Sequence, residues 1–223
     1  APAPYHTMYG PETFLQPVRD PAEYDTAHPV QRAFMESRVG RAFARDEVRE
    51  TVLPAYMGLI RQIDDHLGRL FAFLRERGLM DETMIVFTSD HGDYLGDHWM
   101  GEKELFHECS VRVPLIVVDP RSGADATRGT RSAALVEAID LVPTFLDAYD
   151  QPLPTHRLEG RSLMPLLQGE TPAGWRDAVF SEIDYTPYEA ARVLGIPADA
   201  ARGYMIRTER WKSVHFRRFR PQL

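Results

Sequence analysis

Asp90 and His91 are the residues of this sequence best suited to bind a metal ion. They follow the apolar run 84–87, and polar side chains just past a strand are where open α/β sheets place their chemistry. A carboxylate oxygen and an imidazole nitrogen can both reach one divalent ion, and Gly92 would allow the backbone to turn there. Mixed oxygen and nitrogen ligation suits manganese, zinc, iron or calcium better than a soft metal. The alternative is that Asp90 caps a turn and His91 is an ordinary loop histidine.

Further polar residues of the stretch 88–107 could take part in the same chemistry. Lys103 beside a metal would be a fixed cation for a tetrahedral oxyanion, or else a solvated lysine between two glutamates. His107 could be a proton donor, a ligand or a structural histidine. Asp97 and His98 could also join the site, and the residues alone leave their roles open. Two ligands do not complete a metal site, so others must come from elsewhere in the chain.

Two other kinds of site do not fit this stretch. Ser89 beside Asp90 and His91 superficially suggests a serine triad, but triad members meet through space rather than as neighbours. The sequence also has no G-x-S-x-G elbow around a serine nucleophile. The aspartates are not spaced as in the calcium-binding loop of an EF-hand.

The composition is ordinary for a soluble globular protein, with 43% hydrophobic and 26% charged residues. A length of 223 residues favours one large domain. The net charge of −7 gives no overall basic excess to hold nucleic acid. Cys109 is the single cysteine, so no intramolecular disulfide is possible and a cytoplasmic location is expected. No apolar run approaches the roughly 20 residues of a membrane span, and no signal peptide is recognisable.

Two helices are expected before the polar stretch. Residues 1–29 contain six prolines and should form an irregular strap. Apolar residues on one face predict a helix over 30–45. Apolar residues at three- and four-residue steps from Val52 to Leu74 predict a second helix, with Pro54 near its start and Gly78 just past its end.

Apolar runs and turn residues predict the remaining elements, which alternate between strands and helices. This order indicates an α/β sandwich in which the strands flanking the polar stretch lie centrally. The last two strands should form a hairpin with a tight turn at 209–210. The strands are expected at 84–88, 113–118, 130–136, 178–183, 203–208 and 211–216, and helical segments at 137–149, 163–167 and 187–202.

Several of these segments together resemble the sulfatase group of the alkaline phosphatase superfamily. The resemblance rests on 87–93, on 96–98 and on Lys103 followed by 112–117. The Asp90-His91 pair is similar to the phosphonate monoester hydrolase branch of that group, whereas many sulfatases have Asp-Asn at these positions. Further matching segments are 139–144, 158–163 and 207–212.

This resemblance implies an alkaline-phosphatase-like α/β sandwich, present in part, with a C-terminal β hairpin. It implies that Asp90 and His91 bind a divalent metal ion, with manganese favoured over calcium, zinc or iron. Lys103 would bind the non-bridging oxygens of a small anionic ester, and His107 would lie in or beside the pocket. The implied activity is hydrolysis of phosphonate or phosphate monoesters or diesters through a formylglycine nucleophile. The full-length enzyme is expected to be a homo-oligomer without nucleic-acid or membrane partners.

The sequence also departs from the family pattern. Formylglycine arises in a Cys/Ser-x-Pro-x-Arg motif, but Cys109 is followed by Ser-Val-Arg-Val, so Cys109 is not the nucleophile. The family's N-terminal aspartate ligands are also not found. We therefore expect the C-terminal portion of a longer hydrolase, inactive by itself. Its parts would be the strap 1–29, a hydrolase-core portion 30–176, and the start of a smaller sheet at 177–223.

Two alternatives remain from the sequence. The first is an arylsulfatase of the same fold. The second is a catalytically inactive fragment that acts as a binding or assembly module.

Overall fold

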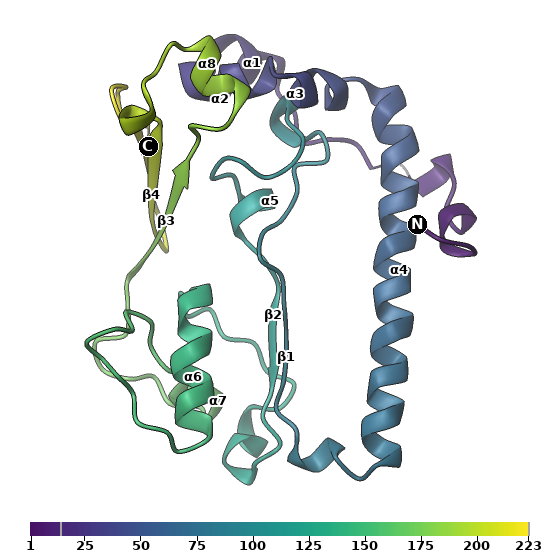
Figure 1. The fold of residues 1–223 in the computed structure, drawn as a ribbon. Coiled ribbons are helices and arrows are strands. Elements are labelled where there is room, and N and C mark those ends of the chain that lie inside the picture. Colours follow the sequence, from purple (N-terminus) through teal and green to yellow (C-terminus); the bar gives the residue numbers. More distant parts are fainter. Residues whose placement is uncertain (14, 223) are drawn as a thin grey trace.

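The fold is mixed α/β, in a computed structural model that describes residues 1–13 and 15–222. A long helix, α4 (Asp46–Glu76), forms one side of the molecule, and a two-stranded sheet runs through its middle (Figure 1). Helix α6 (Leu141–Ala148) and a three-stranded sheet lie on the other side. The other helices are α1 (Pro21–Thr26), α2 (Pro29–Met35), α3 (Arg38–Phe43), α5 (Glu108–Val111), α7 (Met164–Leu167) and α8 (Glu189–Val193), and the strands are β1 (Ile85–Thr88), β2 (Leu115–Val118), β3 (Ala178–Asp184), β4 (Arg202–Thr208) and β5 (Lys212–Phe216).

The central sheet pairs β1 with β2 in antiparallel register, with Ile85 opposite Val118 and Thr88 opposite Leu115. Both strands were predicted. Pro114, which cannot donate to a ladder, stands just before β2 begins. Because the strands run in opposite directions, the end of β1 and the end of β2 lie at opposite ends of this sheet (Figure 1).

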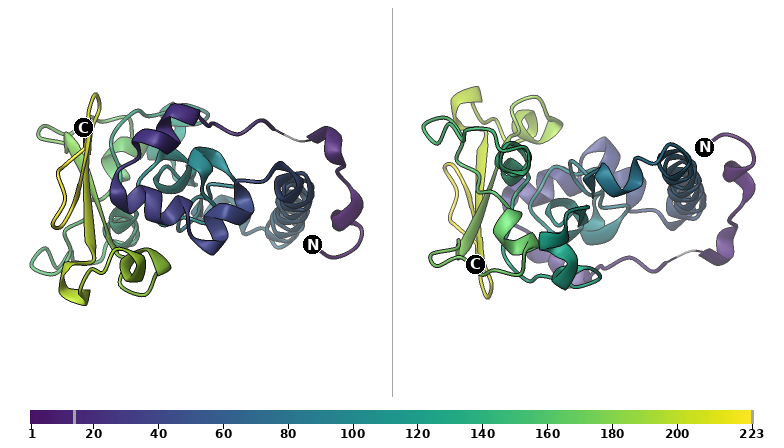
Figure 2. Two further views of the ribbon diagram at one scale, coloured as in Figure 1. Left: turned by 90° about the horizontal axis from the view of Figure 1, so that it is seen from above. Right: turned by 90° about the horizontal axis from the view of Figure 1, so that it is seen from below.

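The three-stranded sheet has the order β3-β4-β5 and is antiparallel throughout. The predicted hairpin is confirmed as β4 and β5, with Arg207 opposite Lys212 at its turn. Figure 2 shows this sheet and α4 at opposite ends of the molecule, with the short helices between them. The division into segments 1–29, 30–176 and 177–223 stays a prediction.

The predicted helix over 30–45 is wrong as a single element, because the chain breaks between α2 and α3. Ser37 stops the first helix and caps the second, since its hydroxyl oxygen accepts a hydrogen bond from the backbone N–H of Gly40 at 3.1 Å. Gly40 then packs so closely on α2 that a Cβ there would lie 2.3 Å from the Met35 carbonyl oxygen.

Helix α4 begins at Asp46, well before the predicted start, and Pro54 therefore lies inside it. Asp46 and Glu47 in the first turn favour this start through the helix dipole. The predicted end is confirmed: Gly78 has φ +66°, and Leu79 N–H donates to the Leu74 carbonyl at 2.8 Å.

The predicted strand over 130–136 is wrong, since these residues form no regular structure. Instead of pairing with another strand, the Leu135 carbonyl accepts a hydrogen bond from the side chain of Trp175, at 3.0 Å from Nε1. No strand among the described residues lies beside this segment to form a ladder.

Large apolar side chains remain exposed on three elements of the fold. They lie on α4, on the β1–β2 sheet and around α6 (Figure 1). The main ones are Tyr56, Leu59, Ile60, Ile63, Leu70 and Phe73 on α4, Phe87, Ile116 and Val118 on the sheet, and Ile139, Val142 and Phe145 around α6. None of the described helices combines the length and apolarity needed to cross a membrane.

The buried core lies between α2, the loop after β1 and the three-stranded sheet. Its fully buried members include Val30 from α2, Tyr94 from the loop, and Phe216 from β5. This core fixes the loop 93–106, which carries Asp97, His98 and Lys103.

A second buried centre joins two of the matching segments. Asp140 is fully buried, and the guanidinium of Arg176 donates to both of its carboxylate oxygens. The backbone N–H groups of Glu137 and Arg161 also donate to this carboxylate, each at 2.8 Å. Asp140 is therefore a structural residue that joins the start of α6 to the segment 158–163.

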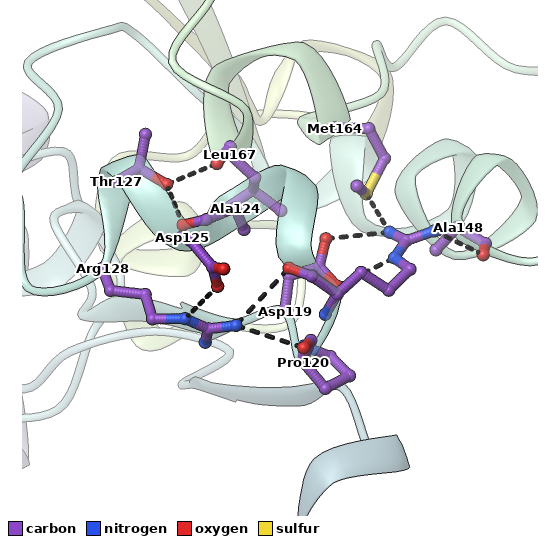
Figure 3. Close-up of polar contacts among 10 residues, drawn as sticks. Asp119, Pro120, Ala124, Asp125, Thr127, Arg128, Ala148, Met164 and Leu167 are labelled. Atoms are coloured by element: carbon purple, nitrogen blue, oxygen red, sulfur yellow. Dashed lines mark hydrogen bonds and ion pairs between the residues drawn. The ribbon is translucent and has the colours of Figure 1, made fainter.

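At the end of β2, Asp119 is the centre of a similar network (Figure 3). Its buried carboxylate accepts hydrogen bonds from the Arg121 guanidinium, which also donates to the Ala148 carbonyl at 2.9 Å. Arg128 binds Asp125 and the Pro120 carbonyl beside it. These contacts hold the turn after β2 against α6.

The described residues of the strap 1–29 form short helices and turns joined by extended chain, and residues near Val18 contact the loop after β1. Val18 N–H donates to Asp97 Oδ1 at 2.9 Å, and His98 N–H donates to the Val18 carbonyl at 2.8 Å. The loop thus gains its shape partly from residues near the N-terminus.

Candidate functional site

Asp90 and His91 lie where β1 has ended and the chain turns away from the sheet. The His91 ring holds Nδ1 2.8 Å from the Gly92 carbonyl oxygen, which can only accept, so Nδ1 donates there and Nε2 is the nitrogen left for a metal ion. That Nε2 lies 3.3 Å from Asp90 Oδ2. One metal ion with bonds of about 2.0–2.2 Å would hold two donor atoms roughly 3 Å apart, so this pair fits a shared divalent ion.

The Asp90 side chain is 83% exposed and the His91 side chain 41% exposed, so a ligand from solvent can reach both. The backbone N–H of His91 donates to Asp90 Oδ1 at 3.0 Å and lowers the pKa of Asp90. The carboxylate is therefore ionised at neutral pH, as a metal ligand must be.

Gly92 is needed here because of a close approach between backbones. A Cβ at this position would lie 1.9 Å from the Cys109 carbonyl oxygen, and Gly92 N–H donates to the Ser110 carbonyl at 2.7 Å. This contact fixes the residues after Asp90 against α5.

Lys103 has an exposed side chain on the same loop. Its backbone carbonyl accepts a hydrogen bond from the Ser110 hydroxyl at 2.5 Å, so the main chain is fixed. Among the described residues, the ammonium group forms no ion pair within 4.0 Å. A cation that is held at a fixed backbone position and makes no direct ion pair can bind an anionic ligand.

His107 lies apart from Asp90 and His91, in a cluster with His98 and Glu23 that we call the Glu23 cluster. One ligand atom from each of the three lies within 4.8 Å of the other two. Glu23 Oε1 is 2.7 Å from His98 Nδ1 and 3.9 Å from His107 Nε2, and the two imidazole rings stack at 4.0 Å. Glu23 comes from α1, so the strap supplies the third member.

Burial, assisted by the neighbouring His98 and Lys212, lowers the pKa of His107 to about 3. The imidazole is therefore neutral at physiological pH, which favours a ligand or structural role over proton donation. Asp97, by contrast, accepts a hydrogen bond from the strap and holds the loop.

Cys109 does not have the properties of a nucleophile. It is half-buried, and burial raises the pKa of its thiol to about 11. Little thiolate exists at neutral pH, in agreement with the missing sequence motif.

The residues predicted from sequence thus form two groups rather than one. Asp90 and His91 form the first group, and His98 and His107 the second. Glu23 was missed. Asp20 and Pro21 indicate a helix start before it, but no local pattern reports a contact across 75 positions.

A pocket of about 270 Å³ lies beside the second group, between α2 and the three-stranded sheet. Lys212 lines it and donates to the Phe106 carbonyl at 2.8 Å. Glu108 accepts from Lys212 and Arg207, which ties α5 to the hairpin. The lining residues are Gln31, Leu105, Phe106, His107, Lys212, Val214, Phe216 and Gln222.

The sequence of this chain is similar to two protein families and to several known enzymes. Residues 7–150 match the family described as Sulfatase, and residues 96–221 match N-sulphoglucosamine sulphohydrolase, C-terminal. The chain is 33% identical to the multifunctional alkaline phosphatase superfamily protein PehA of Trinickia caryophylli, over 99% of this chain and 45% of that protein. It is 37% identical to an N-acetylglucosamine-6-O-sulfatase of Bacteroides thetaiotaomicron, over 72% of this chain and 27% of that protein.

Two solved structures are similar over almost the whole chain. The phosphonate monoester hydrolase of Silicibacter pomeroyi matches with a TM-score of 0.84 and 34% identity, over 99% of this chain and 46% of that one. The phosphonate monoester hydrolase of Agrobacterium radiobacter matches with a TM-score of 0.81 and 32% identity, over the same shares of the two chains. The chain therefore spans about half the length of these relatives.

Proposed function

Because this chain belongs to the sulfatase family, we propose that it is part of a metal-dependent hydrolase of phosphonate or phosphate monoesters or diesters. It would supply two metal ligands and an oxyanion-binding lysine within an alkaline-phosphatase-like α/β sandwich. The similarity to two phosphonate monoester hydrolases over 99% of the chain supports this substrate class.

The observation that carries the proposal is the 3.3 Å separation of Asp90 Oδ2 and His91 Nε2 at the exposed end of β1. Both atoms are free of competing protein cations among the described residues. We propose manganese as the ion, since mixed carboxylate and imidazole ligation suits it. A bound dication would act there as a Lewis acid on the ester group.

Lys103 would bind the non-bridging oxygens of the ester, where charge builds up during displacement. The nucleophile would be a formylglycine from another part of a longer polypeptide, since Cys109 is poorly ionised. The 223-residue chain alone should therefore be inactive.

The test compares this chain with the longer natural protein, using an aryl phosphonate monoester and Mn²⁺. In the longer protein, Asp90→Asn and His91→Ala should lower metal content and rate together. Lys103→Ala should lower the rate about 10²- to 10³-fold while the metal stays bound, as for loss of one oxyanion-binding group. Lys103→Arg is the matched control and should keep part of the activity.

Unchanged kinetics in Lys103→Ala would contradict the proposed role of Lys103 in binding the non-bridging oxygens. Saturable turnover by the 223-residue chain, abolished by Asp90→Ala, would show that the chain carries a whole catalytic site.

An arylsulfatase is the first alternative, supported by the 37% identity to an N-acetylglucosamine-6-O-sulfatase. The ratio of the rates for matched aryl sulfate and aryl phosphonate esters distinguishes the two activities. A ratio strongly in favour of sulfate would replace the proposed substrate class.

An inactive assembly module is the second alternative, supported by the exposed apolar side chains of α4. An intact-mass measurement of the natural protein distinguishes it, because a longer polypeptide favours the enzyme. Homo-oligomerisation of the full-length enzyme and a cytoplasmic location remain parts of the proposal.

A further inference from the structure

We infer that the Glu23 cluster is a second metal site, suited to a dication of the zinc class, that fastens α1 to the loop after β1. It uses none of Asp90, His91 and Lys103, the residues to which the proposed function assigns roles, so it stands independently of that proposal. Its three ligands come from three separate segments, at positions 23, 98 and 107.

The donor atoms have the spacing that such an ion needs. Tetrahedral zinc with bonds of about 2.0–2.1 Å holds its donors about 3.3 Å apart. In the cluster, Glu23 Oε1 lies 2.7 Å from His98 Nδ1 and 3.9 Å from His107 Nε2, values on either side of that distance. Shifts of about half an ångström would bring Glu23 Oε1 to this distance from both nitrogens, and the ligand atoms of the two histidines lie within 4.8 Å of each other.

The side chains around the cluster orient its ligands. The Tyr94 hydroxyl lies 2.8 Å from His107 Nδ1, and Tyr94 is almost completely buried, so the ring is held with Nε2 towards Glu23. The amide of Gln31, also buried, donates to Glu23 Oε1 at 3.1 Å. Metal-binding histidines commonly hydrogen-bond through their second nitrogen, and such partners fix ring orientation.

The charges and exposure also suit a cation. Each of the three side chains is about one-quarter exposed, which leaves room for water to complete the coordination. Two imidazoles and one carboxylate, with water as the fourth ligand, form a donor set typical of zinc sites that bind a water. Lys212 lies near His107 in the pocket lining, but Glu108 balances its charge at 2.5 Å.

The experiment is a titration of the metal-free 223-residue chain with Co²⁺, whose visible absorption reports four-coordinate binding in place of Zn²⁺. The starting protein is Asp90→Ala/His91→Ala, so that binding at the end of β1 does not contribute. We expect saturation at one equivalent. Glu23→Gln should weaken binding at least about tenfold, as expected for loss of a ligand.

His98→Asn is the sharpest second variant. His98 has φ +52°, a conformation that asparagine adopts more readily than most residues, so the imidazole is removed without backbone strain. It should weaken Co²⁺ binding like Glu23→Gln. His156→Asn, in an exposed loop, is the control and should leave binding unchanged.

Hydrogen exchange gives a second readout that does not need the absorption spectrum. Zn²⁺ should slow amide exchange in 18–26 and 96–99 of the starting protein, and not in the Glu23→Gln variant. Binding that survives both Glu23→Gln and His98→Asn would overturn the inference. So would the lack of saturable Co²⁺ binding in a starting protein whose circular dichroism matches that of the unaltered chain.

Discussion

Each strand of the central sheet is followed by an aspartate, and the two aspartates have opposite surroundings. Asp119 directly follows β2, and its side chain is 1% exposed. Arg121 donates from Nε to Oδ1 and from Nη2 to Oδ2, each at 2.9 Å. Asp90 follows β1 after one serine, is largely exposed, and lies 3.3 Å from His91 Nε2.

The same residue type therefore has different roles at the two strand ends. Asp119 stabilises the fold, whereas Asp90, in our proposal, binds a metal ion. Burial alone would raise the pKa of Asp119, but hydrogen bonds from Arg121 outweigh it and the net shift is downward. Both carboxylate oxygens of Asp119 accept hydrogen bonds from the protein, whereas Asp90 has an oxygen that faces solvent and His91. Three measurements test this difference.

The largest effect is expected for Asp119→Ala. It removes charge-assisted hydrogen bonds, and we expect the free energy of unfolding to fall by about 2 kcal/mol. This loss of stability is smaller than for removing one partner of a fully buried ion pair, because the Arg121 side chain is 45% exposed and remains hydrated. Urea denaturation measures it.

Asp125→Ala is the control for that measurement, because Asp125 forms an ion pair with Arg128 on the surface of the same turn. It should change stability by less than about 0.5 kcal/mol. Equal losses in the two variants would mean that burial of Asp119 contributes nothing.

A smaller effect is expected from Glu104, a partly buried carboxyl group without a guanidinium partner. Burial, together with a hydrogen bond to Glu102, raises its pKa to about 7. The folded state then holds this proton more tightly than the unfolded state. The stabilisation is complete below about pH 4.5 and is lost as the pH rises through 7.

Unfolding free energies between pH 5 and pH 8 test this. The unaltered chain should lose about 1 kcal/mol more than Glu104→Gln over this range, since glutamine does not titrate and solvent around the partly exposed carboxyl group reduces the effect well below that of the full pKa shift. Parallel pH profiles for the two proteins would contradict the raised pKa.

The smallest effect is expected for Asp90→Ala, whose exposed side chain makes no buried contact. Its stability in the presence of a chelator should stay within about 0.5 kcal/mol of the unaltered chain. The chelator is needed because a bound metal stabilises the folded state by mass action. A loss above about 1 kcal/mol would make Asp90 a structural residue like Asp119.

Local sequence patterns predicted those elements whose causes are local. The strands β1 and β2 follow from short apolar runs, and the end of α4 follows from Gly78. The break between α2 and α3 was missed because the apolar residues continue across Ser37 in helical spacing, while a single capping hydroxyl interrupts the helix.

In the candidate site, likewise, the sequence predicts only the contacts between residues that are close together in the chain. Asp90 and His91 are neighbours in the chain, so their proximity follows from sequence. The pairing of His98 with Glu23 does not, because it depends on the strap crossing the loop. The apolar face of α4 is exposed in this structure, which the sequence does not show, since periodicity reports a helix face and not what covers it.

The contacts that shape the loop after β1 also set an order of events in folding. Arg19 donates to the Gly96 carbonyl across 77 positions of the chain, and Lys212 donates to the Phe106 carbonyl across 106 positions. Contacts between such distant residues form slowly, because a long loop must close before they stabilise the fold. We therefore expect the loop to reach its final conformation in a late kinetic step, after α4 and the β4–β5 hairpin, whose contacts are local.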